Sequence, residues 1–184
     1  MRATLLMALL TLAPVPRVPA LWLGRLDPTQ LLGPWYVLAV ASREKDFALE
    51  KDVRGIEGVL VTLTPGNGLR LQVSRHRLDG CSRQDMELVK QTSGWVFESP
   101  SHGVLEYRVL GTNFRDFAVV FTQLEFGDEA FNTVELYSRT ETASREALRL
   151  FSKWSNGLGF LAQQQARLQK DVTCAQKLLQ VGTC

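Results

Sequence analysis

The sequence contains few of the residues from which metal sites and nucleophilic sites are usually built. It has two histidines and three cysteines in 184 residues. His76 and His102 lie far apart, and neither has a cysteine or carboxylate beside it at a metal-ligand spacing, so we interpret both as solvated side chains near turns. The sequence therefore predicts no metal site, no cofactor and no catalytic residue.

Long apolar runs and an excess of charge are also missing. After the first twenty residues, no stretch approaches the roughly 18 uninterrupted apolar residues that a membrane helix requires. The whole chain has 21 basic and 19 acidic side chains, and residues 1–20 contain two of the basic ones and no acid, which leaves 19 of each sign. This neutral balance predicts no general attraction to nucleic acid or to an anionic membrane.

The first twenty residues have the pattern of a secretory signal peptide. Arg2 precedes an apolar run from Leu5 to Leu12, and small residues follow before a cleavage point after Ala20. Three prolines in this stretch oppose a core helix. We therefore expect a secreted protein with a single domain over residues 21–184, a length that can bury a sizeable core. Its polar C-terminal tail is expected to begin at about residue 162.

The three cysteines predict one disulfide bond. Secretion favours such a bond, and an odd number leaves one thiol over. Cys81 lies in mid-chain after a glycine turn, whereas Cys174 lies in the C-terminal tail, so a bond between them would hold the tail against the body. It would close a loop of about 90 residues, which the chain-entropy model values at about 4 kcal/mol. We assign Cys184 as the unpaired one because chain ends fray.

Alternating apolar and polar residues, separated by turn residues, predict eight strands. The clearest is Leu69–Ser74, where leucine and valine alternate with polar residues after the hairpin turn Pro65–Gly68. No helical crossover interrupts the series, which predicts an antiparallel meander, and closing the meander into a barrel removes its exposed edges. The predicted strands cover residues 33–42, 55–64, 69–74, 83–90, 94–98, 104–112, 117–124 and 133–139.

From Thr142 onward the apolar period becomes that of a helix. Four apolar residues at spacings of four, three and four form one stripe, with Thr142 or Ser144 as the cap and Gly157 or Gly159 near the end. A single amphipathic helix after eight strands packs its stripe on the sheet. The predicted fold is all-β: an eight-stranded antiparallel up-and-down barrel, or calyx, with one C-terminal α-helix packed outside. The stripe consists of Ala147, Phe151, Trp154 and Leu158.

Three short motifs in this chain resemble those of the lipocalin family. Gly33-x-Trp35 opens the first strand, Thr112-Asn113-Phe114 precedes the seventh, and Arg139 ends the eighth. Their order and spacing, the late helix and the placement of the two paired cysteines are all similar to lipocalins, and the likeness covers about residues 26–174. Within the family, the chain is most similar to the epididymal lipocalins.

The resemblance implies a calyx that is open at one end and binds a small apolar molecule, with the motifs at the closed end. Because an arginine can stack on an indole ring and donate to carbonyl oxygens together, we expect Arg139 to cover Trp35, a contact worth about 0.5–2 kcal/mol. Gly33, Trp35, Thr112 and Arg139 are therefore expected to be structural. The usual second motif reads Thr-Asp-Tyr, and this chain lacks both its carboxylate and its phenol.

Strand alternation predicts which side chains line the calyx. If Trp35 points inward, so do the alternate residues after it, and the same rule applies backward from Arg139 along the last strand. A bulge would shift a strand by one residue and exchange its faces. Most of the predicted lining is apolar, with two tyrosines and one glutamate as polar contacts. The predicted ligand-binding residues are Val37, Ala39, Ala41, Val61, Leu71, Val73, Leu105, Tyr107, Val119, Phe121, Glu135 and Tyr137.

The resulting hypothesis is a secreted, monomeric carrier of a small hydrophobic molecule of the retinoid, steroid or fatty-acid class, acting in male reproductive fluid. An enzyme is not expected, because no predicted strand carries the inward cysteine that the thiol-dependent prostaglandin isomerases of this family need. One alternative is a barrel filled by its own side chains. Another is a non-enzymatic protein that binds a cell-surface partner, for example on sperm, through its outer surface or the charged loop 43–54, where we expect Phe47 and Leu49 to be exposed.

Overall fold

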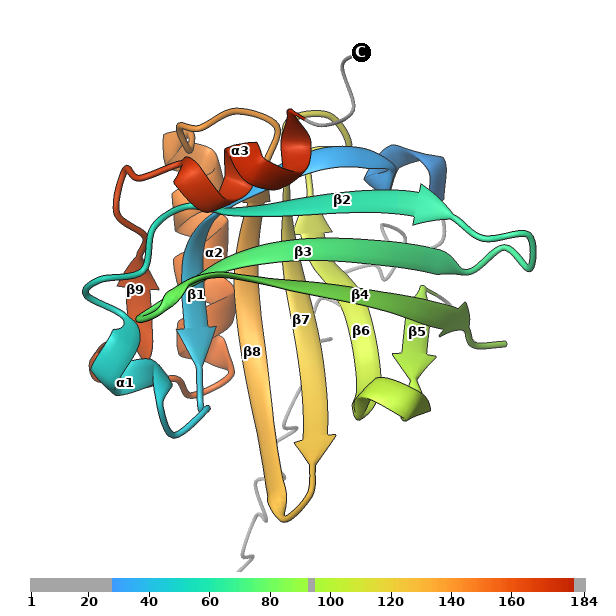
Figure 1. Cartoon of the computed structure of the whole chain (residues 1–184), viewed down its shortest axis with the longest axis horizontal. Coiled ribbons are helices and arrows are strands. Elements are labelled where there is room, and N and C mark those ends of the chain that lie inside the picture. The colour runs from blue at the N-terminus through green and yellow to red at the C-terminus, as the bar shows by residue number, and fades with distance from the viewer. Residues whose placement is uncertain (1–27, 93–94, 181–184) are drawn as a thin grey trace, which may run out of the picture.

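The computed structural model describes residues 28–92 and 95–180, so the predicted signal peptide and Cys184 lie outside the described residues. The strands of this part form a single sheet (Figure 1), and they are β1 (Gly33–Ser42), β2 (Glu57–Leu63), β3 (Leu69–Arg77), β4 (Gly80–Lys90), β5 (Val96–Ser99), β6 (Val104–Thr112), β7 (Phe117–Phe126), β8 (Glu129–Ser138) and β9 (Gln165–Arg167). Neighbouring strands follow one another from β2 to β8, then β1, and β1 also pairs with β2. This closure confirms the predicted eight-stranded antiparallel barrel.

The helices lie outside the sheet or at its ends. The helix α2 (Arg145–Gly157) begins as the sequence predicts, because the Ser144 hydroxyl accepts a 3.1 Å hydrogen bond from the Ala147 amide. Short turns of 3₁₀ helix occur at η2 (Pro28–Leu31), η3 (Pro100–His102) and η4 (Ala162–Gln164). Two further helices, α1 (Phe47–Glu50) and α3 (Thr173–Leu179), were not predicted. None of the helices in the described part of the chain is long and apolar enough to cross a membrane.

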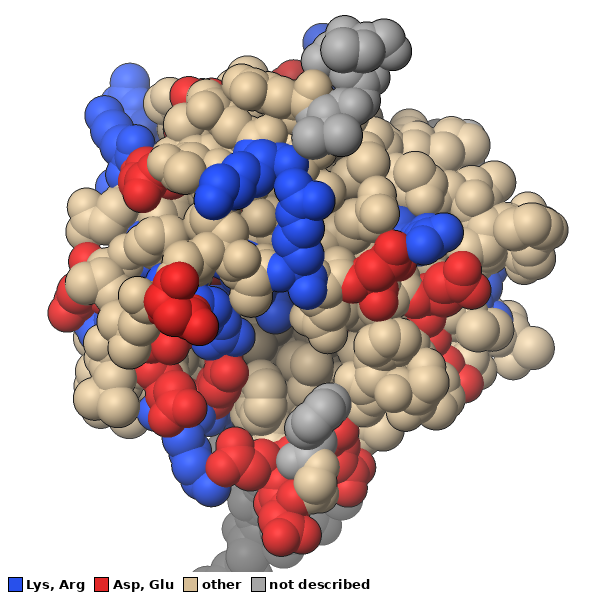
Figure 2. Space-filling view, in the orientation of Figure 1, with Lys and Arg blue, Asp and Glu red and all other residues tan. Residues whose placement is uncertain are grey.

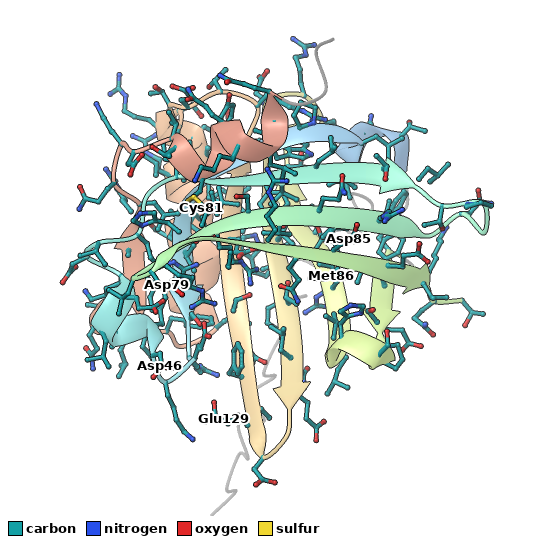
Figure 3. The ribbon with its side chains drawn as sticks, viewed as in Figure 1. Asp46, Asp79, Cys81, Asp85, Met86 and Glu129 are labelled. Atoms are coloured by element: carbon teal, nitrogen blue, oxygen red, sulfur yellow. A yellow bond between two sulfur atoms is a disulfide. The ribbon has the colours of Figure 1, made fainter. Side chains whose placement is uncertain are left out.

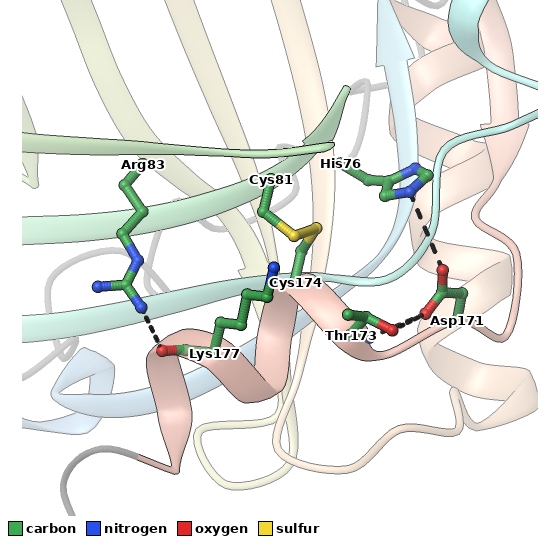
Figure 4. Close-up of a disulfide and its surroundings, with 7 residues drawn as sticks. All are labelled: His76, Cys81, Arg83, Asp171, Thr173, Cys174 and Lys177. Atoms are coloured by element: carbon green, nitrogen blue, oxygen red, sulfur yellow. Dashed lines mark hydrogen bonds and ion pairs between the residues drawn. A yellow bond between two sulfur atoms is a disulfide. The ribbon is translucent and has the colours of Figure 1, made fainter. Parts of the chain in front are cut away.

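The C-terminal tail has more structure than its polar sequence suggests. Its strand β9 pairs with β1 outside the closed barrel, and α3 packs on β2 and β3. The predicted disulfide is present: Cys81 of β4 is bonded to Cys174 of α3, with their Cα atoms 5.4 Å apart (Figure 4). Gly58 lets α3 approach β2 closely, because a Cβ atom there would lie 2.9 Å from the Cα of Ala175.

The buried side chains form two groups. One fills the inside of the barrel and includes Trp35, Leu71 and Tyr137. The other lies between the barrel wall and α2, where Leu136 packs with Phe151. The inner group is the one that any ligand in the calyx would contact.

Candidate ligand-binding calyx

Trp35 closes one end of the barrel. Its side chain is 2% exposed, and its indole Nε1 donates a 2.7 Å hydrogen bond to the carbonyl oxygen of Leu31 in η2. Arg139 lies over the ring, with its Cζ 3.5 Å from the ring centroid. Its guanidinium also donates to the carbonyl oxygens of Pro34 at 2.8 Å, Leu32 at 2.8 Å and Gln30 at 3.0 Å.

Gly33 makes this close arrangement possible. Its φ angle is +95°, a conformation that costs other residues energy, and a Cβ atom there would lie 3.3 Å from Nη1 of Arg139. Burial lowers the pKa of Arg139 below its ordinary value. A guanidinium is chosen over an ammonium at such a site because it holds its charge and presents several donors in one plane.

The second motif forms the turn between β6 and β7, and its amide replaces the missing carboxylate. Oδ1 of Asn113 accepts hydrogen bonds from the backbone amides of residues 115, 116 and 117, at 3.2, 2.8 and 3.2 Å. Its Nδ2 donates to Asp116 at 2.9 Å. Phe114 has a φ angle of +63°, and its amide donates to the Thr112 hydroxyl at 2.9 Å. The turn is therefore held by local hydrogen bonds that do not require the usual acid.

Two small adjoining cavities lie inside the barrel. One has a volume of about 30 Å³ and the other about 50 Å³, and they share Arg75, Leu124, Thr133 and Glu135 in their walls. The first is lined on its apolar side by Leu71, Val73, Met86 and Val104, and on its polar side by Gln84, Thr122, Tyr107 and Tyr137. Both volumes are well below the 300–1,000 Å³ of a typical small-molecule site. The described side chains around Arg75 therefore leave little free space in this part of the barrel.

A cluster of two arginines and two glutamates borders these cavities, and all of its side chains are buried except that of Arg75, which is 26% exposed. Arg54, which is 3% exposed, donates through Nε to Glu57 at 2.9 Å, and its Nη2 bonds the same oxygen. Nε of Arg75 lies 3.5 Å from the other oxygen of Glu57, and Nη2 of Arg75 lies 3.4 Å from Glu135. Within the described residues, Oε2 of Glu57 and Nε of Arg75 are buried without a hydrogen-bond partner. These two atoms face each other at 3.5 Å, so their ion pair lacks a well-formed hydrogen bond.

Burial and ion pairing act in opposite directions on the pKa values in this cluster. Burial raises the pKa of Glu57, an effect that the guanidinium groups of Arg54 and Arg75 oppose without cancelling. For Arg75, burial acts to lower the pKa, but the carboxylates of Glu135 and Glu57 outweigh it and the net shift is upward. Arg75 is therefore a permanent cation in the calyx wall.

Both tyrosines of the calyx are held in the neutral form. Burial raises the pKa of Tyr107 and of Tyr137 well above the ordinary value for a phenol. The Tyr137 hydroxyl donates to Glu135 at 3.3 Å. Both phenols therefore keep their proton at physiological pH.

The segment between β1 and β2, residues 43–56, covers the other end of the barrel, and we call it the lid loop. Phe47 of α1 is 1% exposed and belongs to the inner core, with the guanidinium of Arg54 5.3 Å from its ring centroid. The lid loop is tied to its surroundings by ion pairs, Lys45 with Glu129 of the β7–β8 hairpin and Glu50 with Arg77 of β3 at 2.8 Å. Acidic and basic side chains gather around a hollow on the face seen in Figure 2. Figure 3 places Asp46 and Glu129 toward the same side of the molecule.

Seven of the predicted ligand-binding residues lie inside the barrel. The inner core or the cavity walls include Val37, Val61, Leu71, Val73, Tyr107, Glu135 and Tyr137. They come from five strands, β1, β2, β3, β6 and β8, and converge on the same interior.

Five predicted lining residues lie elsewhere, and their predicted direction is wrong. The β1–β8 register shifts between Val37 and Ala39, so Leu38 and Val40 enter the inner core while Ala39 and Ala41 pack in the outer group with α2. In β7, residues 117–121 are all apolar, since α2 covers the outer face of the strand. Alternation therefore does not show which of these side chains point inward. Val119 and Phe121 lie in the outer group. Leu105 is 44% exposed beside a register shift in β6. The expected exposure of Phe47 is wrong as well, since its side chain is 1% exposed, whereas Leu49 is 79% exposed as expected.

The sequence interpretation missed Arg75 and Glu57. Arg75 continues the inward alternation of Leu71 and Val73, and Glu57 lies on the same face of β2 as Val61. The signal was therefore present in the strand period. We expected charged residues to face solvent, and the buried counter-charges that allow these two to point inward come from segments far apart in the sequence.

Comparisons with known proteins agree with this geometry. Residues 32–172 match the model of the lipocalin / cytosolic fatty-acid binding protein family. This chain is a lipocalin. This lipocalin is 70% identical to epididymal-specific lipocalin-6 of Macaca mulatta, in an alignment that covers 97% of this chain and 99% of that one. It is 68% identical to epididymal-specific lipocalin-6 of Homo sapiens, in an alignment that covers 89% of this chain and all of that one.

A solved structure of the siderocalin Ex-FABP shares the fold of this lipocalin. The TM-score is 0.74 at 22% identity, over 79% of this chain and 97% of that one. Lipocalins bind small hydrophobic ligands in the calyx, and the closed barrel with its inner core is the part of this chain that corresponds to it.

Proposed function

We propose that this lipocalin is a secreted carrier of a small hydrophobic molecule with an acidic head, and that among the retinoid, steroid and fatty-acid classes it takes a fatty acid. The observation that carries the proposal is the position of Arg75, a cation in the same cavity wall as Leu71, Val73 and Met86. Apolar side chains bind the body of a ligand, and a few polar groups orient it. A ligand carboxylate beside Arg75 would form a charge-assisted hydrogen bond by competing with the carboxylates of Glu57 and Glu135, whose contacts with Arg75 are long, at 3.5 and 3.4 Å.

Binding requires the calyx to open further. The two cavities, about 30 and 50 Å³, hold no more than a few atoms. The lid loop is the part to move, because Glu44 and Arg54 from this loop line the second cavity. Lid movement would draw Phe47 out of the inner core and widen the space around Arg75.

The test compares ligands of matched length. Quenching of intrinsic tryptophan fluorescence by palmitic acid, hexadecanol, retinol and a steroid gives each affinity. We expect saturable micromolar binding of palmitic acid and hexadecanol binding that is weaker by about tenfold or more, because one charge-assisted bond is worth about 1.5–3 kcal/mol. Equal affinity for acid and alcohol would contradict the role of Arg75. Absence of saturable binding by all four ligands would contradict the carrier function itself.

A pair of variants tests the same role from the protein side. Arg75→Gln should weaken palmitic acid about tenfold and leave hexadecanol nearly unchanged, whereas Arg75→Lys, which keeps the charge, should retain most of the affinity. Arg70→Gln is the matched control, since Arg70 lies on the same strand but is exposed and pairs with Asp85.

We also propose a place of action in the fluid of the male reproductive tract, and no catalytic step. The names of the two epididymal relatives support the first. The disulfide supports the second, since it leaves no thiol in the calyx among the described residues. Immunodetection of the protein in epididymal fluid against blood plasma tests the location, and a higher level in plasma would contradict it.

A second candidate function is binding of a cell-surface partner through the lid loop. Two exposed leucines favour it: Leu49 of the lid loop is 79% exposed, and Leu78 in the turn after β3 is 75% exposed. Leu49→Ser should abolish binding of the labelled protein to sperm. Val89→Ser, a matched change at a side chain 60% exposed on β4, should leave it intact. Equal binding by both variants would rule this function out.

A further inference from the structure

A shallow groove runs along the outside of the barrel, between α2 and β9, away from the calyx. It has a volume of about 360 Å³. Four of its lining residues are basic and none is acidic. The lining consists of Arg145, Leu148, Arg149, Ser152, Lys153 and Asn156 from α2, and Arg167 from β9.

The four cations of this groove are exposed and have no acidic partner within the described residues. Most arginines elsewhere in the described chain are engaged. Arg54, Arg70 and Arg77 pair with carboxylates, and Arg43 and Arg139 donate to backbone carbonyls. The balance of 19 basic and 19 acidic side chains in residues 21–184 therefore conceals a local concentration of unneutralised positive charge on this face.

The arrangement of these cations opposes helix stability. Arg145, Arg149 and Lys153 are spaced by four residues, which places them on one face of α2 at steps of about 6 Å. Like charges at this spacing destabilise a helix. A row of cations about 12 Å long, with Arg167 on the facing wall, matches the regular negative charges of a linear polyanion.

We propose that this groove binds a sulfated polysaccharide chain of the cell surface or extracellular matrix. Basic surface clusters are recognised by such polymers through their charge. Ser152 and Asn156 add hydrogen-bonding groups for sugar hydroxyls, and the apolar lining is limited to the half-buried Leu148. An anionic membrane is disfavoured because the groove is concave and presents no exposed large apolar side chain for insertion.

The test measures binding of the full-length secreted protein to a heparin octasaccharide by calorimetry between 50 and 200 mM salt. Arg149→Gln/Lys153→Gln should weaken binding about tenfold or more, and should reduce the slope of log K against log salt by about 1.5, since each lost contact removes about 0.7–0.9. Arg115→Gln/Lys177→Gln is the control, because it removes the same charge from exposed positions outside the groove.

We expect the control variant to bind heparin as tightly as the wild type. Neither variant should melt at a lower temperature than the wild type, because the groove variant relieves repulsion along α2. Fully desulfated heparin should not bind. The proposal is overturned if heparin does not bind, if both variants lose affinity equally, or if desulfated heparin binds as well. It is also overturned if phosphatidylserine vesicles or duplex DNA bind as tightly as heparin at the same salt concentration and lose as much affinity in the groove variant. The calyx ligand plays no part in this assay, so either proposal can fail without the other.

Discussion

Replacing Arg139 with alanine tests how strongly the closed end stabilises the barrel. The guanidinium donates hydrogen bonds to three carbonyl oxygens, at 2.8, 2.8 and 3.0 Å, and covers the Trp35 ring from 3.5 Å. A hydrogen bond contributes about 0.5–1.5 kcal/mol net. Stacking of a cation on an aromatic ring adds about 0.5–2 kcal/mol. Because Arg139 is only partly buried, we take the lower half of each range and expect Arg139→Ala to lose about 2–4 kcal/mol.

A lysine at this position separates charge from geometry. Arg139→Lys keeps the positive charge but cannot reach three carbonyl oxygens in one plane, so we expect it to lose about 1–2 kcal/mol. Combining Arg139→Ala with Trp35→Phe in a double-mutant cycle should give a coupling energy of about 0.5–1.5 kcal/mol for the stacked pair. The order of stability should be wild type, then the lysine variant, then the alanine variant.

The assay is guanidinium chloride unfolding followed by far-ultraviolet circular dichroism, which does not depend on the fluorescence of Trp35. Arg70→Ala is the control, since the exposed pair of Arg70 with Asp85 is worth at most about 1 kcal/mol. The reasoning is refuted if Arg139→Ala loses less than about 1 kcal/mol, or if Arg139→Lys is as stable as the wild type.

Three other parts of the structure give predictions for the same unfolding assay. Gly58→Ala places a Cβ atom 2.9 Å from an α3 backbone atom and should cost about 1–3 kcal/mol, whereas Gly66→Ala, which has open space, should be neutral. Cys174→Ser opens a 93-residue separation and should cost about 4 kcal/mol, and a loss under 1 kcal/mol would contradict the tether. Because burial raises the pKa of Tyr107 and Tyr137 above the unfolded value, stability holds below pH 10 and falls as the pH rises beyond it, by about 1.4 kcal/mol per pH unit for each phenol. Tyr107→Phe should reduce that slope by half, and an unchanged slope would count against this assignment.

The barrel was predictable because local turn residues and alternating apolar residues mark its strands in the sequence. The turn at Pro65–Gly68 and the alternation after it mark β3 without any knowledge of its neighbours. The helix α2 was predictable from the Ser144 cap and an apolar stripe. In contrast, β9 is three residues long and α3 is seven, and neither has a period that distinguishes it from a loop. Their structure depends on contacts with β1 and β2 and on the disulfide.

The calyx lining was only partly predictable because inward direction is a property of the register. A single bulge after Val37 exchanges the faces of Ala39 and Ala41 with those of Leu38 and Val40, and all four are apolar. Sequence alternation cannot detect such an exchange when both faces are buried. Arg75 was missed for the opposite reason. The alternation of β3 clearly placed it on the inward face, but its charge led us to expect it in solvent.

The two ends of the barrel differ in how their contacts would respond to a ligand. At the closed end, Trp35 is 2% exposed and Arg139 is fixed by three carbonyl oxygens. At the open end, the pair of Lys45 with Glu129 has side chains 77% and 41% exposed, and exposed ion pairs contribute at most about 1 kcal/mol. The rim of the lid loop is therefore held more weakly than the closed end, although its opening must also draw Phe47 out of the inner core and disturb the buried pair of Arg54 with Glu57. A ligand should enter at the lid loop and contact Arg75 before it reaches Trp35. Binding should therefore leave the contact of Arg139 with Trp35 unchanged.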